Sequence, residues 1–262
     1  MSVVCFKESL HSHNGYDIHM IVTKPFQTQK KVCIILLHGT CSDMNEAGNA
    51  YVYLSRQLAD HGYASIRFDF IGCGSSDVDY IHYTYKSAIS DTNEIIEYAK
   101  KLGYDEICLL GWSQGAAIAF LSANEDVSSV IALAPAADMR IMIHKEDYEY
   151  AKENGYVWYD PGFKASVRLS LEWFEDVLNT DVLDIYSKKN LPTLAIHGLH
   201  DTIVDPNYSR MSVDASAHPN SRVIYMDECD HVFNVLTHGY DYFKIVSQEI
   251  IQWLNEVYDK KR

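Results

Sequence analysis

The chain has 262 residues, of which 47% are hydrophobic and 22% charged, and its formal net charge is −14. This length suits one large α/β domain, alone or with an insertion, and the composition is ordinary for a soluble globular protein. The negative charge argues against nucleic acid or an anionic membrane surface as a partner. The first residues lack a basic region followed by a long apolar core, and no apolar run approaches the ~18 residues of a membrane span. We therefore expect a cytoplasmic protein with neither a signal peptide nor a membrane span.

Alternating strand and helix signals fill the first half of the chain. Loosely alternating apolar residues around Asn14-Gly15 predict a β-hairpin with a tight turn, and the apolar run 31–39 predicts a strand buried on both faces of a sheet. The signals that follow are a helix at about 46–61, a strand at 63–70, a glycine-rich loop at 71–77, a helix at about 86–102, a strand at 106–112, a helix at about 114–124 and a strand at 127–133. This order predicts a parallel sheet with helices on both faces, because parallel strands need crossover connections.

Residues 136–189 interrupt this alternation and carry many aromatic side chains. A segment this long inside an α/β domain is usually a lid or an inserted subdomain. Strand and helix signals then resume with a strand at 194–198, a helix from about 206, a strand at 222–226 and a helix at about 239–258. We therefore divide the chain into a first core part at 1–135, an inserted cap at 136–189 and a second core part at 190–262.

The cysteines and histidines indicate neither a disulfide framework nor a metal site. The six cysteines are scattered without a C-x-x-C pair, which favours reduced thiols in an intracellular protein. Neither an H-E-x-x-H motif nor a tight His/Cys cluster is present. We expect no metal and no organic cofactor.

The pattern Gly111-x-Ser113-x-Gly115 joins the end of a predicted strand to the start of a predicted helix. A serine on such a turn adopts a strained backbone and presents its hydroxyl above the sheet edge, and the glycines avoid collisions with neighbouring elements. The helix start also directs N–H groups toward the site. This context predicts Ser113 as a nucleophile, although so short a pattern also occurs by chance.

Two aspartates could be the acid that orients a catalytic histidine. Asp201 and Asp205 both follow the strand 194–198. Asp205 directly precedes Pro206, which can occupy the first helical position, so Asp205 is interpreted as a helix N-cap. Asp201 is therefore the predicted acid.

The base is expected after the next strand, where His231 lies in a loop. His218 precedes that strand, and His238 lies near the start of the final helix. His38 and His197 end core strands and are interpreted as structural residues. His231 is therefore the predicted base, with a plain surface-loop histidine as the alternative.

These residues define a nucleophilic mechanism. His231 would take the proton of Ser113 as it attacks an ester carbonyl, and Asp201 would orient the imidazole and stabilise the imidazolium. The backbone N–H groups of Gln114 and Thr40 would bind the oxyanion. A plain strand-end loop residue is the alternative for Thr40.

The loop 67–75 resembles a dinucleotide fingerprint only in part. It lacks the third glycine and the early position that the fingerprint requires, so a structural turn is the better interpretation.

The chain also carries a set of motifs in a characteristic order. They are His38-Gly39, Arg67-Phe68-Asp69-Phe70-Ile71-Gly72-Cys73-Gly74-Ser75, Gly111-Trp112-Ser113-Gln114-Gly115, Leu133-Ala134-Pro135-Ala136-Ala137, His197-Gly198-Leu199-His200-Asp201 and Asp230-His231. As a set they resemble the α/β-hydrolase superfamily, most closely bacterial cinnamoyl (feruloyl) esterases, with monoacylglycerol-lipase-like and serine-aminopeptidase-type hydrolases as neighbours. The resemblance implies an eight-stranded, mostly parallel core sheet, the Ser–Asp–His triad in this order, the oxyanion pair and a small cap over an acyl pocket.

The cap departs most from this family. Cinnamoyl esterases bind the phenolic ring with a cap carboxylate and a cap tyrosine, and here Met142 and Trp173 would stand near those places. Aromatic cap residues favour an apolar or aromatic acyl group, with Trp158, Tyr159 and Trp173 as candidate pocket residues. The alternative is that these aromatics form a small core of the insertion itself.

The sequence thus predicts a serine carboxylesterase that forms an acyl-enzyme on Ser113 with a small-molecule ester, and it leaves a homodimer open. A lipase or peptidase of the same fold is a second hypothesis. A catalytically silent hydrolase fold that binds a ligand is a third, and a dinucleotide-dependent oxidoreductase is disfavoured.

Overall fold

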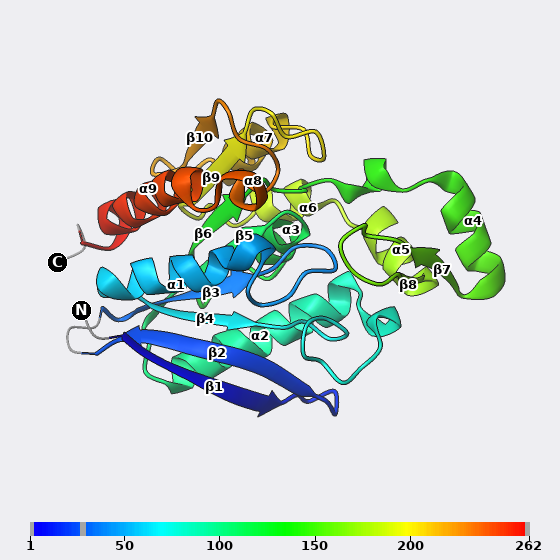
Figure 1. Ribbon diagram of the computed structural model, residues 1–262, viewed down its shortest axis with the longest axis horizontal. Helices are drawn as coiled ribbons and strands as arrows, with labels where there is room; N and C mark the ends of the chain where they lie inside the picture. Colours follow the sequence, from blue (N-terminus) through cyan, green and yellow to red (C-terminus); the bar gives the residue numbers. More distant parts are fainter. Residues whose placement is uncertain (1–2, 27–29, 260–262) are drawn as a thin grey trace.

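The computed structural model describes residues 3–26 and 30–259, and a central sheet organises them (Figure 1). Its eight strands lie in the order β1-β2-β4-β3-β5-β6-β9-β10. Their bounds are β1 (Val3–His11), β2 (Asp17–Pro25), β3 (Val32–Leu37), β4 (Ala64–Phe68), β5 (Glu106–Trp112), β6 (Val127–Leu133), β9 (Thr193–Gly198) and β10 (Arg222–Met226). β2 runs antiparallel to both β1 and β4, and all other neighbours are parallel. The mostly parallel, eight-stranded α/β fold is confirmed.

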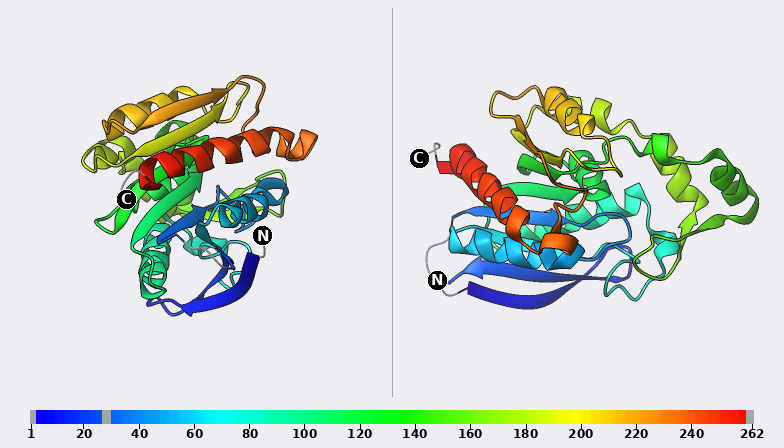
Figure 2. Two further views of the ribbon diagram at one scale, coloured as in Figure 1. Left: turned by 90° about the vertical axis from the view of Figure 1, so that its left-hand side faces the viewer. Right: turned by 45° about the horizontal axis from the view of Figure 1, so that its top comes forward.

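Helices cover both faces of this sheet, as the end-on view in Figure 2 shows. Side chains of α1 (Ala50–Asp60) and α9 (Asp241–Tyr258) pack on one face. Side chains of α2 (Tyr85–Lys101), α3 (Gln114–Leu121) and α7 (Asn207–Ser216) pack on the other.

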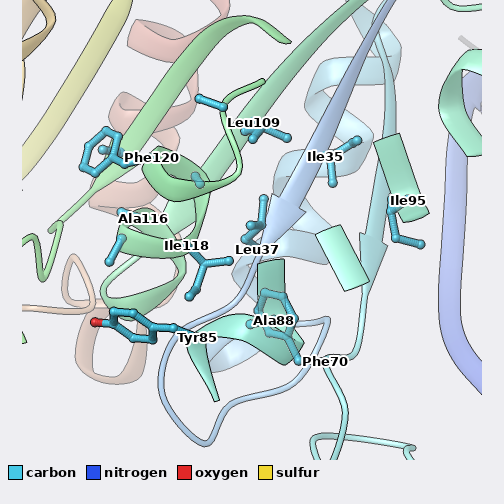
Figure 3. Packing of buried hydrophobic residues seen from close by; sticks show 14 of the residues in the cluster. Ile35, Leu37, Phe70, Tyr85, Ala88, Ile95, Leu109, Ala116, Ile118 and Phe120 are labelled. Atoms are coloured by element: carbon cyan, nitrogen blue, oxygen red, sulfur yellow. The ribbon is translucent and has the colours of Figure 1, made fainter. Parts of the chain in front are cut away.

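The strand β3 illustrates why both faces are apolar. Ile34 and Leu36 face α1 and α9, whereas Ile35 and Leu37 face α2 and α3, because successive strand residues point to opposite faces. Figure 3 shows Ile35 and Leu37 among side chains of α2 and α3. The prediction from the continuous apolar run is confirmed, because β3 is buried on both faces of the sheet.

Two local predictions differ from the structure. The hairpin turn is a five-residue loop, 12–16, in which Ser12 N–H donates to the Tyr16 carbonyl at 2.7 Å. The Ser12 hydroxyl bonds to Glu94 of α2 at 2.7 Å, and this contact holds the wider loop. The helix expected from about 46 begins at Ala50, after a 3-10 turn, η1 (Ala47–Asn49).

The chain between β6 and β9 forms a group of short elements whose buried side chains, such as Tyr186, belong to the main hydrophobic core. These elements are η3 (Met139–Met142), α4 (Lys145–Asn154), β7 (Tyr156–Tyr159), β8 (Val167–Ser170), α5 (Leu171–Leu178) and α6 (Val182–Ser187), and β7 and β8 pair in an antiparallel hairpin. We call residues 136–189 the insert. In Figure 1 the elements from α4 to α5 project beyond the end of the sheet toward which β3 and β4 point.

Two polar contacts fix the insert to the core near the start of α2. Asp176 of α5 is 6% exposed, and its carboxylate contacts both the Lys86 ammonium at 2.6 Å and the Lys86 N–H at 3.1 Å. Arg168 of β8 bonds to Asp79 at 2.8 Å. Asp79 is the N-cap of η2 (Tyr80–His82), which precedes α2 in the chain. The insert is thus bonded to one residue before the N-terminus of α2 and to one residue in its first turn.

The described residues contain no helix that is long and apolar enough to span a bilayer, and no gathering of three or more potential metal ligands among them. All six cysteines are free thiols, and only Cys5 is exposed. The other five lie buried, where burial raises the pKa of thiols such as Cys108.

Candidate active site

The turn between β5 and α3 has the geometry that the Gly-x-Ser-x-Gly pattern predicts. Ser113 has φ 54° and ψ −121°, a conformation that L-residues rarely adopt. A Cβ at Gly111 would overlap the backbone of Gly115, and a Cβ at Gly115 would overlap the carbonyl of Leu37. Between residues 107 and 120, Ser113 alone is partly exposed, so the turn presents this one side chain to solvent.

The strained turn is held against the end of β6. Ser113 N–H donates to the Leu133 carbonyl at 2.9 Å, and the Ser113 carbonyl accepts from Ala136 N–H at 3.1 Å. These bonds extend the β5–β6 pairing past the last strand residues. The surrounding backbone thus fixes the conformation, as strained functional residues require.

Asp201 and His231 lie in direct contact. His231 Nδ1 is 2.6 Å from Asp201 Oδ2, and the Asp201 side chain is fully buried while that of His231 is 17% exposed. Asp201 Oδ1 accepts from the N–H groups of Ile203 and Val204 at 2.8 and 2.9 Å. Burial by itself would raise the pKa of Asp201, but the hydrogen bonds from His197, His231 and the backbone outweigh it and hold the pKa well below its usual range.

The loop that carries His231 is braced from within and from β5. Asp230 Oδ1 accepts from Asn234 N–H at 2.7 Å, and Asn234 Oδ1 accepts from Asp230 N–H at 3.0 Å. The indole of Trp112, directly before Ser113, donates to the His231 carbonyl at 3.1 Å. No hydrogen bond joins the Ser113 hydroxyl to the His231 ring in the described chain. The bond from the Trp112 indole to the His231 carbonyl therefore connects the nucleophile turn to the loop of the base.

The other candidate acids and bases have different partners. Asp205 accepts from Asn207 N–H at 2.9 Å, but it lies one residue before the N-cap of α7, which is Pro206, so the bond closes the turn that leads into the helix. His218 accepts from Asn220 N–H at 3.1 Å, and the ring of His238 packs edge-on against Tyr242. His38, another strand-end histidine, is buried and bonded to the backbone, with Nδ1 2.9 Å from the Gly39 carbonyl.

His197 is the residue that the sequence interpretation missed. It is a buried strand-end histidine, as expected, but its Nε2 lies 2.9 Å from Asp201 Oδ2. The only signal in the sequence is its position four residues before Asp201.

The two residues predicted to supply the oxyanion donors are in side-chain contact. The N–H groups of Thr40 and Gln114 have no hydrogen-bond partner within the described residues, whereas the neighbouring Gly39 N–H donates to Glu46 at 2.8 Å. The Thr40 hydroxyl donates to Gln114 Oε1 at 3.1 Å, and the Tyr83 hydroxyl donates to the same oxygen at 3.1 Å. The side chains therefore tie the loop of one donor to the helix start of the other.

The glycine-rich loop after β4 is a structural turn, as interpreted. Buried Asp69 accepts from Met44 N–H at 2.7 Å and from the N–H and hydroxyl of Ser75 at 2.8 and 2.7 Å. A Cβ at Gly74, where φ is 54°, would overlap the Asp69 carboxylate. The loop thus fastens residues 40–44, which carry the Thr40 donor, to the core.

The three aromatic candidates for a substrate pocket lie in different surroundings. Trp173 is 5% exposed, its indole N–H has no partner within the described residues, and its ring packs edge-on against Phe174. Trp158 is 60% exposed and lies against Tyr156. Tyr159 is 40% exposed and points to the opposite face of the hairpin, where burial and the nearby Cys41 thiol raise its pKa. The pocket role of all three stays a prediction.

Comparisons with known proteins show the family and the fold of the chain. A model of the alpha/beta hydrolase family matches residues 34–241. A proline iminopeptidase of Clostridioides difficile (strain 630) is 38% identical over 88 residues, which are 34% of this chain and 28% of that protein. The match thus spans less than a third of that relative's length.

Solved structures show the same fold at low sequence identity. Est1E of Butyrivibrio proteoclasticus, with ferulic acid bound, has a TM-score of 0.78 at 21% identity, covering 95% of this chain and 98% of that one. The alpha/beta hydrolase domain-containing protein 10 from mouse has a TM-score of 0.75 at 21% identity, covering 98% of this chain and all of that one. Fold, motif order and the match over most of the sequence agree, and the chain belongs to the alpha/beta hydrolase family.

Proposed function

We propose that the protein is a serine hydrolase that cleaves carboxylic esters through an acyl-enzyme on Ser113. One observation carries the proposal: the predicted base and acid, 30 residues apart in sequence, meet at 2.6 Å. The residue before Ser113 holds the carbonyl of that base. The strained, partly exposed Ser113 adds support. Its backbone conformation costs free energy, and such strain is typical of functional residues.

The chemistry follows from the roles of the groups. His231 Nε2 accepts the proton of the Ser113 hydroxyl as the oxygen bonds to the ester carbon, and the carbonyl electrons move to oxygen. The N–H groups of Thr40 and Gln114 stabilise this oxyanion. When the ester C–O bond breaks, the alcohol leaves with the proton from His231. Water then repeats the sequence on the acyl-enzyme and releases the carboxylic acid and the free serine.

The insert supports an apolar or aromatic acyl group. Trp173 contributes a large aromatic ring to the buried side of the insert, and its indole N–H, itself buried, lacks a partner in the described chain. Esters of acetate, long fatty acids and hydroxycinnamates should be compared for kcat/KM. Trp173→Phe should raise KM for the aromatic esters, and Trp158→Phe, on the outer face of the hairpin, is the matched control. Equal effects of the two substitutions would contradict this acyl pocket.

The central test is turnover of short p-nitrophenyl esters. Ser113→Ala should abolish turnover while circular dichroism and thermal unfolding show a folded protein. A fluorophosphonate should label wild-type Ser113 covalently and leave the variant unlabelled. Turnover at the wild-type level in the folded variant would sink the mechanism, and wild-type protein that is neither labelled nor active would favour a non-catalytic ligand-binding role.

The acid assignment has an internal control, because the loop offers two aspartates. Asp201→Asn should lower kcat by about 10³–10⁴-fold, since an amide cannot hold the required tautomer of the base. Asp205→Asn should change kcat little, because the amide oxygen of asparagine can accept the same bond from Asn207 N–H. The reverse result would exchange the two assignments.

A peptidase activity is the second candidate, and the similarity to a proline iminopeptidase favours testing it. An aminoacyl p-nitroanilide series that includes proline should be run beside the esters. A kcat/KM for an anilide above that for every ester would replace the esterase proposal and leave Ser113 as the nucleophile.

A further inference from the structure

The imidazole of His197 has hydrogen-bond partners at both ring nitrogens and contacts the proposed triad. It lies at the end of β9 and is completely buried. Its Nε2 is 2.9 Å from Asp201 Oδ2 and 3.2 Å from the Val204 carbonyl, and its Nδ1 is 2.8 Å from the Ser209 hydroxyl. The proposed mechanism assigns it no task.

The partners fix which ring nitrogen of His197 carries a proton. Nε2 faces a carboxylate oxygen and a carbonyl oxygen, and both can only accept. Nε2 must therefore donate. Nδ1 faces the Ser209 hydroxyl, which can donate to it.

His197 completes the set of donors around the Asp201 carboxylate. Oδ1 accepts two backbone N–H groups, from Ile203 and Val204, and Oδ2 accepts Nδ1–H of His231 and Nε2–H of His197. A carboxylate has about four acceptor positions, so all of them are used. We propose that His197 is a positioning residue. By donating to the oxygen that also accepts from His231, it fixes the rotation of the Asp201 carboxylate and weakens the hydrogen bond between Asp201 and His231. This inference rests on the proposed function, since it assigns Asp201 and His231 their catalytic roles.

The shared oxygen has a predictable effect on the pH range of activity. An acceptor that already holds one donor binds a second more weakly, so Asp201 stabilises a protonated His231 less than it would alone. Removal of the His197 donor should therefore favour protonated His231. The loss of activity on the acid side should then begin at a higher pH, because the base works only when neutral.

The other charged groups near the pair have separate partners or face solvent. On the loops that carry Asp201 and His231 they are His200, Asp205, Asp227, Glu228 and Asp230. Asp205 and Asp230 accept backbone N–H groups, Glu228 accepts the Tyr242 hydroxyl, and His200 is exposed. From α7 and β5 the contacts are uncharged, the Ser209 hydroxyl and the Trp112 indole.

The kinetic test removes the donor and then restores one. His197→Met should lower kcat about tenfold with KM nearly unchanged, and should move the acid limb of kcat/KM up by about half a pH unit. His197→Gln, whose amide can place an N–H near Asp201, should recover much of both effects. His38→Met, which removes another buried strand-end imidazole, should leave the acid limb in place. A folded His197→Met enzyme with wild-type kcat and acid limb would overturn the proposal.

A spectroscopic measurement on the unmodified protein covers the case in which His197→Met does not fold. Two-bond ¹H–¹⁵N spectra should show His197 as the Nε2–H tautomer with a slowly exchanging proton. An Nδ1–H tautomer would overturn the proposal without any variant. Wild-type protein that hydrolyses no ester but shows the Nε2–H tautomer would instead reject the proposed function and keep the hydrogen bond from His197 to Asp201.

Discussion

The backbone strain at Ser113 predicts that removal of its side chain stabilises the fold. A residue held at φ 54° and ψ −121° costs about 1–3 kcal/mol, which glycine does not incur. Glycine also gives the unfolded chain more freedom, which offsets about 0.5–1 kcal/mol of the gain. Ser113→Gly should therefore exceed Ser113→Ala in free energy of unfolding by about 1 kcal/mol, since alanine keeps the Cβ and the strain. For a chain of this size that is about 2–4 °C in Tm.

A second serine of the same segment is the matched control. Ser122 ends α3 with φ −85° and ψ −3°, a conformation that costs alanine nothing. There the order should reverse, with Ser122→Gly less stable than Ser122→Ala by about 0.5–1 kcal/mol. Urea unfolding and thermal scans of the four variants measure both differences. If glycine is the less stable substitution at both positions, the strain argument for the Ser113 turn is refuted.

Two further substitutions test the packing of the nucleophile turn and a buried acid. Gly115→Ala should lower stability by at least the ~1–3 kcal/mol typical of overpacking, because the new Cβ would overlap the Leu37 carbonyl; an unchanged Tm would contradict this close approach. Burial raises the pKa of Asp91 to about 7, so the folded chain keeps a proton that the unfolded chain loses near pH 4, and stability falls between those values. Asparagine at this position can still bond to Tyr16 and to the Ile71 N–H. In urea unfolding, the difference in free energy of unfolding between Asp91→Asn and wild type should therefore be about 2–3 kcal/mol more in favour of the variant at pH 8 than at pH 5. An equal difference at both pH values would refute the raised pKa of Asp91.

Features encoded by local sequence were predictable. The strand, turn and helix around Ser113 are contiguous, so their order alone predicts the turn that the structure contains. The alternating strands and helices likewise predict a parallel sheet, because each helix that connects two parallel strands directly follows a strand in the sequence. Chain order also led to Asp201 and His231, which lie in contact.

Features that depend on distant contacts were not predictable. The sequence suggests a helix from about Glu46, but its side chain bonds to the Gly39 N–H and the Ser42 hydroxyl, and the helix starts later. The bond from His197 to Asp201 depends on how the loop between them folds back. In the insert, aromatic composition gave no hint that Trp158 lies exposed on the outer face of a hairpin.

The packing of Trp112 bears on how far the insert can change. Its indole comes from the part of the chain before the insert and is buried between Phe233 and Phe243, which come after it. Together with the pairing of β6 and β9, this contact joins the two core parts without any atom of the insert. Loop exchange or a backbone break in the projecting part, residues 144–168, therefore leaves the contacts between the two core parts in place, whereas Ala136 and Tyr186 bond to or pack in the core and have to be kept. Substrate range could be redesigned there by exchanging segments, while Ser113, Asp201 and His231 keep their places in the core.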